Sequence, residues 1–177
     1  MTEAPDPGAL LAVEGDRVYT VDDQWSTGWS VRTSVVASQL RPSRAVILDR
    51  EALPDGAFDL RAAGTTLYYT VGNGEYGPVL AANALPWAPS TEVRTLRLGA
   101  TLQAGPTIET PGSFSTLLLV EPTGALIVRN GAIVERHDVQ GASAVLEWSR
   151  DVGLYPRTAR ADAQPGSYVL SLGLGGT

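Results

Sequence analysis

The stretch SFSTLLLVEPTGALIVRNGAIVERHDV, residues 113–139, decides the fold class. Its aliphatic runs are separated by two turn signals, Glu121-Pro-Thr-Gly124 and Asn130-Gly131. Proline presets the second position of a turn, and Asn-Gly between apolar runs is the strongest short hairpin signal. The pattern therefore predicts a meander of three antiparallel strands over residues 115–120, 125–129 and 132–139.

A two-residue turn at Asn130-Gly131 would set Val128 opposite Ile133 on one face and Ile127 opposite Val134 on the other. Both faces of this hairpin are then apolar, so both need cover. We expect a second sheet to cover one face. Ile127 and Val134, on the other face, are candidate contacts with a partner.

Strand signals continue outward from this unit. Gly15-Asp16 predicts a hairpin that sets Glu14 opposite Arg17 and Val13 opposite Val18, because Gly accepts positive φ at the first turn position. Further β-branched or alternating runs predict strands over residues 34–40, 45–49, 65–71, 91–104, 144–148 and 167–174. Residues 49–53 are expected to form at most one helical turn, and residues 157–164 a long connection.

These short strands, with turn signals about every ten residues, predict an all-β fold with little or no helix. The expected architecture is an antiparallel β-sandwich, of jelly-roll or immunoglobulin-like type, or a partly open barrel. A chain of 177 residues is long enough for one domain. We assign it to residues 9–174, with a flexible acidic arm over 1–8 and a short tail over 175–177.

Composition excludes several chemistries. The chain has no Cys and no Lys, all 13 basic residues are Arg, and there is one His. Disulfides, thiolate nucleophiles, thiolate metal sites and Schiff bases are excluded, and we expect no cofactor and no metal. The formal net charge of −6 argues against binding nucleic acid or an anionic membrane surface.

No set of residues predicts catalysis. His137 stands beside Asp138, but strand neighbours point to opposite faces, so Asp138 is not placed to orient it, and we interpret His137 as an exposed strand residue. Acidic pairs such as Asp22-Asp23 and Glu147/Asp151 are interpreted as solvated turn residues. The protein is therefore expected not to be an enzyme.

Tryptophans are the strongest binding signal. Trp25 and Trp29 lie in a polar segment and Trp87 lies between prolines, whereas Trp148 is expected in the core. Loop tryptophans can cap the end of a sandwich, anchor a partner protein or stack on a sugar. Trp25, Trp29 and Trp87 therefore join Ile127 and Val134 as candidate partner or ligand contacts.

In general character these features resemble the tail, baseplate and capsid-accessory proteins of tailed bacteriophages. The resemblance implies a structural virion protein that docks on other subunits or oligomerises. Met1 to Gly8 is acidic and Pro-rich, unlike a signal peptide, so we expect synthesis in the cytoplasm and incorporation into a virion. The alternative is a carbohydrate-binding or receptor-binding β-sandwich module.

Overall fold

A computed structural model describes residues 9–25, 31–54, 56–71, 90–153, 156–162 and 167–172. Throughout these ranges the chain forms strands and turns and no helix, which confirms the all-β expectation. None of the described segments forms a helix that would reach across a lipid bilayer. The expected arm 1–8 and tail 175–177 lie outside the described residues, and the single domain over 9–174 stays a prediction.

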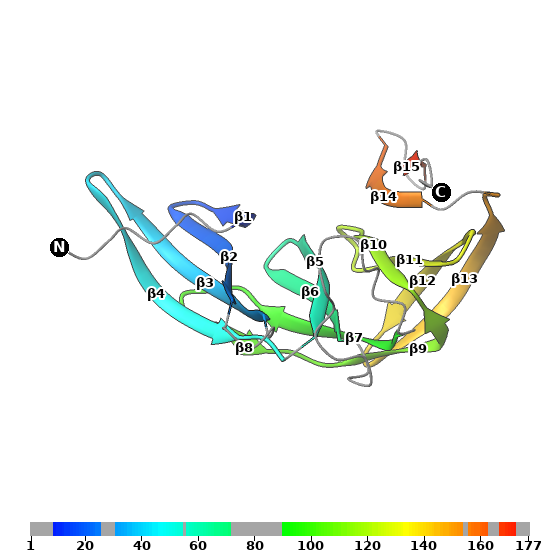
Figure 1. The fold of residues 1–177 in the computed structure, drawn as a ribbon, viewed down its shortest axis with the longest axis horizontal. Coiled ribbons are helices and arrows are strands. Elements are labelled where there is room, and N and C mark those ends of the chain that lie inside the picture. Colours follow the sequence, from blue (N-terminus) through cyan, green and yellow to red (C-terminus); the bar gives the residue numbers. More distant parts are fainter. Residues whose placement is uncertain are drawn as a thin grey trace.

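The first sheet has four strands in sequence order (Figure 1). Its strands are β1 (Ala9–Glu14), β2 (Arg17–Trp25), β3 (Val31–Arg41) and β4 (Arg44–Ala52). The predicted pairs Glu14–Arg17 and Val13–Val18 are confirmed, with Gly15 at φ 61°. Residues 49–52 continue β4, so the helical turn expected from residue 49 was wrong.

The second sheet is larger and runs in the order β10-β11-β12-β13-β9-β7-β6-β5, with β8 paired to β7. Its strands are β5 (Ala57–Ala63), β6 (Thr66–Val71), β7 (Ser90–Arg97), β8 (Gln103–Ala104), β9 (Ile108–Phe114), β10 (Thr116–Val120), β11 (Leu126–Asn130), β12 (Ile133–Gln140) and β13 (Ser143–Asp151). β14 (Pro156–Ala161) and β15 (Tyr168–Leu172) form a separate hairpin. Strands β1–β4 and β10–β13 follow one another as in meanders, rather than in Greek-key order.

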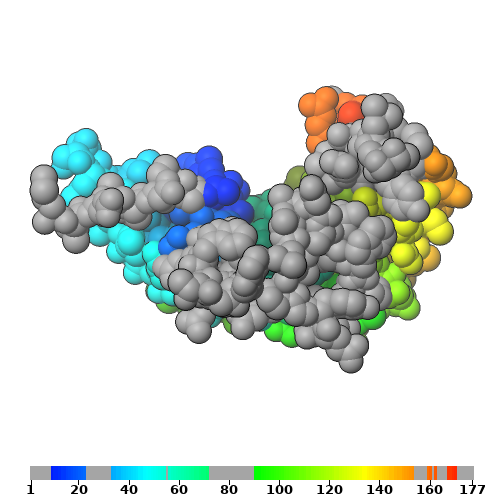
Figure 2. Space-filling view, viewed as in Figure 1, coloured from blue at the N-terminus to red at the C-terminus, as the bar shows by residue number. Residues whose placement is uncertain are grey.

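Three apolar cores hold these layers together. The first lies between the first sheet and β6–β7, and includes Tyr19, Val35 and Leu67. The second fills the inside of the curled second sheet, around Phe114 and Leu126. The third lies on the outer side of β10–β12, beneath the β14–β15 hairpin. The molecule is therefore elongated, with the first sheet at one end and the hairpin at the other (Figure 2).

Side chains, rather than a backbone ladder, close the second sheet into a partial barrel. Its two end strands, β5 and β10, lie next to each other. The Leu117 amide donates to Asp59 Oδ2 over 2.8 Å, and Arg61 Nε donates to the Leu118 carbonyl over 2.8 Å. Asp59 sits in a bulge of β5 at φ 53°, a left-handed conformation that Asp and Asn adopt more readily than most residues.

Four further sequence-based expectations were wrong for identifiable reasons, and the first is the position of the turn after β11. Asn130 pairs with Ile133, so the turn is Gly131-Ala132, one residue later than predicted. Gly131, at φ 62°, takes the first turn position, and Asn130 instead donates through Nδ2 to the Ser113 carbonyl. The shift places Val128 opposite Glu135 and Ile127 opposite Arg136.

The run over 91–104 is two strands, because the chain reverses between Leu98 and Leu102, both buried in the first core. Apolar residues continue to appear at every second position across this reversal, so the sequence looks like a single strand. Residues 156–161 form β14 rather than a connection, since the hairpin gains its apolar cover from the barrel and needs few large residues of its own. His137 is 2% exposed, not a surface residue.

We predict that Asp59→Ala lowers the free energy of unfolding by about 1–3 kcal/mol, because it leaves the Leu117 amide without an acceptor. Asp59→Asn is the matched control, since Asn keeps an acceptor and tolerates positive φ. Burial raises the pKa of Asp59, so ionisation of this carboxyl opposes folding above that raised pKa. At neutral pH the Asn variant should unfold in urea no earlier than the parent; equal loss in both variants would contradict the closing role.

We predict that Gly131→Ala costs about 1–2 kcal/mol, because an L side chain is strained at φ 62°. Gly112→Ala is the control: a Cβ there meets nothing within 4 Å and the backbone is not left-handed. It should stay within about 0.5 kcal/mol of the parent in urea unfolding. An unchanged Gly131→Ala variant would refute the turn assignment.

Candidate functional site

The outward side of the first sheet carries several of the exposed large apolar side chains in the described part of the chain. Pairing register and period-two alternation place Tyr19, Val35 and Ala37 on the inner side, in the first core. We call the opposite side the outer face. Its members are Leu10, Val13, Val18, Thr20, Asp22, Ser34, Val36, Ser38, Leu40, Ala45, Ile47, Arg50 and Ala52.

Four large apolar side chains stand exposed on the outer face. Leu10 is 64% exposed, Val13 59%, Leu40 52% and Ile47 47%. The cross-strand row Val13, Val18, Ser38 and Ile47 joins β1 to β4. Ser34 and Val36 of the same face are buried, at 7% and 5% exposed, so only part of the face is free. A one-sided sheet normally turns polar residues to solvent, and a contiguous apolar surface marks an interaction site.

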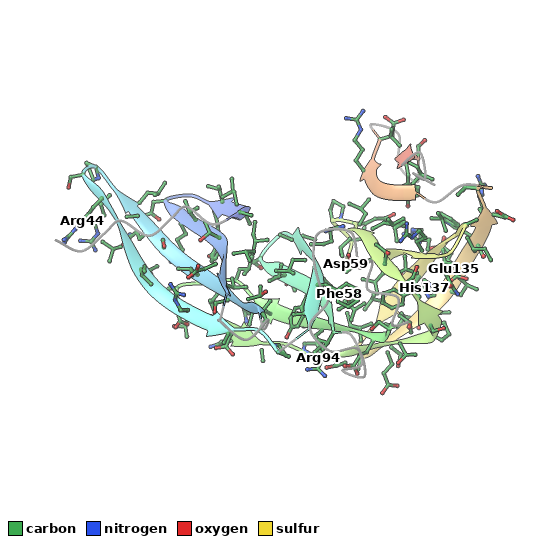
Figure 3. All side chains as sticks on the ribbon, in the orientation of Figure 1. Arg44, Phe58, Asp59, Arg94, Glu135 and His137 are labelled. Atoms are coloured by element: carbon green, nitrogen blue, oxygen red, sulfur yellow. The ribbon has the colours of Figure 1, made fainter. Side chains whose placement is uncertain are left out.

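Charge is nearly absent from this face. Among its side chains that the structure describes, the ionised ones are Asp22 and Arg50, which form an ion pair with each other. Arg32 has the same parity, and its side chain lies outside the description. Arg41 and Arg44 lie directly opposite each other at the free end of the β3–β4 hairpin, on the inner parity (Figure 3). Interface centres are likewise depleted in charge.

The ends of the sheets are poorly suited to strand addition. The first sheet ends in β1 and β4, and the second in β5 and β10. All four strands carry a bulge or register shift. Bulges twist an edge away from a potential pairing strand. The edges of the first sheet are therefore poorly suited to pairing with a strand of another chain.

The predicted contact residues fall elsewhere. Ile127 is 0% exposed and Val134 3%, and both lie in the third core under Ala159, Tyr168 and Leu170 of the chain's own hairpin. The cover expected on this face is thus supplied by the chain itself.

Trp25 ends β2, and its side chain lies outside the description, as do Trp29 and Trp87 entirely. Their expected role stays a prediction. Trp148 packs against the third core, with its ring 6.0 Å from that of Tyr168.

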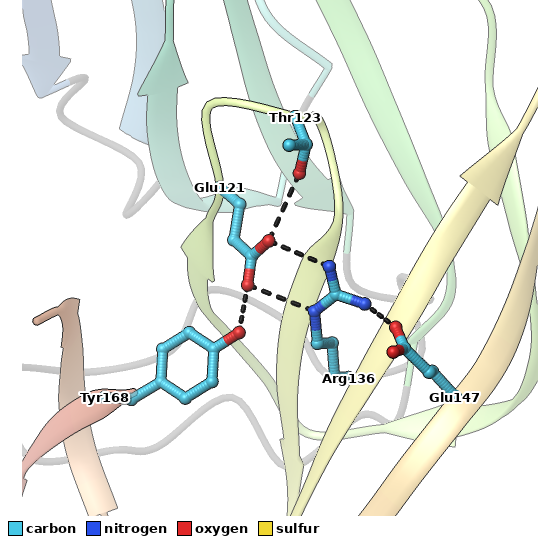
Figure 4. A network of polar contacts seen from close by, with 5 residues as sticks. All are labelled: Glu121, Thr123, Arg136, Glu147 and Tyr168. Carbon is cyan, nitrogen blue, oxygen red and sulfur yellow. Dashed lines mark hydrogen bonds and ion pairs between the residues drawn. The ribbon is translucent and has the colours of Figure 1, made fainter. Parts of the chain in front are cut away.

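A bidentate ion pair holds the β14–β15 hairpin to the barrel (Figure 4). Arg136 donates to Glu121 through Nε at 3.1 Å and Nη2 at 2.9 Å. Tyr168 also donates to Glu121, and Glu147 pairs with Arg136. The Arg136 guanidinium is the main cause that lowers the pKa of Glu121 below its ordinary value.

His137 is buried inside the barrel, beside the partly exposed carboxylate of Glu135. Its Nε2 lies 3.1 Å from Glu135 Oε2, and its Nδ1 has no hydrogen-bond partner. Side chains alternate between the two faces of a strand, so residues 135 and 137 both lie on the inner face, where they can form this pair. Neither ring nitrogen is hydrogen-bonded to a hydroxyl, so no Ser–His arrangement of a nucleophilic triad is assembled around this histidine.

Two shallow grooves flank β8. The first, about 310 Å³, is lined by Leu53, Tyr69, Arg94 and Glu51 among others. Burial raises the pKa of Tyr69, and Arg94 is paired with Glu92 at 2.9 Å. The second, about 420 Å³, is lined mainly by Thr, Gly, Ala and Pro, with Arg97 and Gln103. Among the described residues no cluster of three or more His, Cys, Asp or Glu is arranged to hold a metal ion.

Comparison with protein-family models, with curated proteins and with solved structures finds no match for this chain. The outer face was missed at the sequence level because Leu10, Val13, Leu40 and Ile47 read as ordinary strand residues. The sequence did contain a usable signal, because Leu40 and Ile47 lie close to the turn at Pro42-Ser43. Residues this near the tip of a long hairpin are expected to extend past the core.

We predict that Glu121→Gln loosens the hairpin by about 1–3 kcal/mol, because Arg136 and Tyr168 lose their charged acceptor. Trypsin cleavage after Arg160, followed by mass spectrometry, reports the release. Because the folded-state pKa of Glu121 is lowered, its contribution is present above the ordinary value of 4.5 and is lost as pH falls further.

Acid should therefore speed cleavage in the parent, assayed with a protease that is active at acid pH, and change the Gln variant less. Thr123→Ala is the control, since Thr123 donates only a single exposed hydrogen bond to Glu121, at 3.2 Å. Equal protease resistance of parent and Glu121→Gln at neutral pH would contradict the role assigned to this ion pair.

Proposed function

We propose that this chain is a non-enzymatic structural component of a larger assembly, and specifically a virion protein of a tailed bacteriophage. The observation that carries the proposal is the outer face of the first sheet. It combines four exposed aliphatic side chains with an ion pair between Asp22 and Arg50. Such a surface is costly to leave in water and gains free energy when another protein covers it.

The shape of the molecule supports the same proposal. The first sheet extends away from the barrel and ends in the β3–β4 hairpin (Figure 1), near which Leu40 and Ile47 are exposed. Bulges at the edge strands favour a defined face-to-face contact over open-ended strand pairing. Subunits of ordered particles need contacts of this closed kind.

A carbohydrate-binding or receptor-binding module is the second candidate. The first groove is the feature that bears on it, since Tyr69, at 7% exposed, reaches its wall beside Glu51 and Arg94. A sugar site uses such an aromatic face with polar neighbours. The groove is small and its lining charges are partly paired within the protein.

We predict that the chain co-purifies with virions from the strain that encodes it, at a fixed copy number through a density gradient. Ile47→Arg should lower that copy number at least tenfold, because it places a charge on the outer face. Val145→Arg is the matched control: Val145 is 48% exposed, against 47% for Ile47, but lies on β13.

Absence of the chain from purified particles would refute the virion role. Titration with a broad panel of glycans tests the carbohydrate-binding candidate. If that candidate is right, a glycan should quench tryptophan or tyrosine fluorescence in a saturable way, and Tyr69→Ala should abolish the quenching.

A further inference from the structure

We propose that the free end of the β3–β4 hairpin docks on an acidic protein surface, with its two arginines against carboxylates and its aliphatic side chains against apolar residues beside them. We call residues 40–48, LRPSRAVIL, the hairpin tip. This inference rests on the proposed function only in taking this end of the first sheet as a contact surface. It adds the chemistry of the partner.

The hairpin tip carries charge that the structure leaves unneutralised. Arg41 and Arg44 lie directly opposite each other, and both are exposed. Neither forms an ion pair with a described residue, and Arg41 donates to the side-chain carbonyl of Gln39, at 3.5 Å. Like charges directly opposite each other on neighbouring strands are destabilising. An anion bound by the two guanidinium groups would remove this repulsion.

The neighbouring hairpin solves the same problem differently. Glu14 and Arg17 flank the turn between β1 and β2 in the same way that the two arginines flank the turn between β3 and β4. There the charges are opposite, and Arg17 Nη1 lies 3.7 Å from Glu14 Oε2. An acid–base pair keeps a hairpin end as polar as two arginines do. The like-charged pair of the hairpin tip is therefore explained better by an external anion than by solubility.

Exposed apolar surface stands beside these charges. Leu40 is 52% exposed, Ile47 47% and Leu48 37%. Three of the nine large aliphatic side chains that are exposed in the described part of the chain thus belong to the hairpin tip. Arginine together with apolar side chains is the composition of a protein–protein contact. A partner must therefore offer apolar cover as well as negative charge.

The hairpin tip is held in place by its own backbone. Its two strands pair up to the residues that flank the turn, and the Leu40 amide donates to the Asp16 carbonyl over 2.7 Å. The hairpin projects from the end of the first sheet, with Arg44 near its far end (Figure 3). Docking then costs little conformational entropy, which favours binding through a small contact.

Charge on the rest of the molecule favours a protein over other anionic partners. The chain has a net charge of −6, so the two arginines of the hairpin tip leave −8 on the remainder. Nucleic acid and anionic membranes bind surfaces with many cations, and both would repel this remainder. A protein can place a few carboxylates against the hairpin tip alone and cover its aliphatic side chains. Guanidinium groups bind carboxylates through two parallel hydrogen bonds.

The test is binding of the full chain to a dye-labelled random copolymer of glutamate and tyrosine, an acidic polypeptide with apolar side chains, measured by fluorescence anisotropy. The parent should bind it with an affinity that falls as salt is added. Arg44→Glu should weaken binding at least tenfold, while the urea midpoint of unfolding stays the same or rises, because the hairpin tip then has an acid–base pair. A purely structural role would not lower affinity without lowering stability.

Arg97→Glu is the matched control, since it makes the same change in net charge at an exposed arginine on β7. It should leave the affinity within about twofold of the parent, because screening limits the reach of a distant charge. Equal weakening by both variants would overturn the proposal, and so would a parent that does not bind the copolymer.

Duplex DNA and vesicles of phosphatidylglycerol with phosphatidylcholine test the other anions. Binding to either one as tight as to the copolymer would overturn the protein partner. These results are separate from the fate of the proposed function, which virion content decides. A chain that is present in particles but does not bind the copolymer would keep the function and refute the acidic partner.

Discussion

Closure of the second sheet by two side chains is the constraint on which the rest of the structure depends. Asp59 and Arg61 reach from β5 to the backbone of β10 and replace the ladder that would have joined these strands. The second core lies inside the resulting curl, and the third lies on the outside of the same strands. Both cores need β10 to be held against β5, since β10 contributes Leu117 to one and Leu118 to the other.

Bulges give this closure its geometry. The shift between Leu117 and Leu119 turns Leu118 outward, and the shift between Phe58 and Arg61 aims Asp59 at the neighbouring backbone. Bulges in β1 and β4 likewise disfavour the addition of a further strand at either edge of the first sheet. Exposed aliphatic side chains stand on the outer face and also on β12, β13 and β15, at Ile133, Val145, Leu146 and Val169.

Much of the fold was predictable because strand alternation and turn residues are local. The Gly15-Asp16 hairpin followed from a Gly at the first turn position. Placing Gly131 at the first turn position in the same way would have given the observed turn, Gly131-Ala132. The sequence analysis placed the turn at Asn130-Gly131 instead, because Asn-Gly is on average the stronger hairpin signal. β14 was missed because its cover comes from residues more than twenty positions away along the chain.

The candidate site was predicted less well. Ile127 and Val134 were correctly seen to be apolar, but an apolar strand face does not say whether the chain itself or another molecule covers it. The outer face shows the opposite case, since Leu40 and Ile47 read like core residues and stand exposed.

The sequence by itself determined that this chain is an all-β protein without thiol or lysine chemistry, because residue content and alternation act locally. Only the tertiary structure decided which apolar faces are buried and which are free. That outcome depends on where the β14–β15 hairpin and the first sheet dock, and docking is set by contacts between residues far apart in the chain.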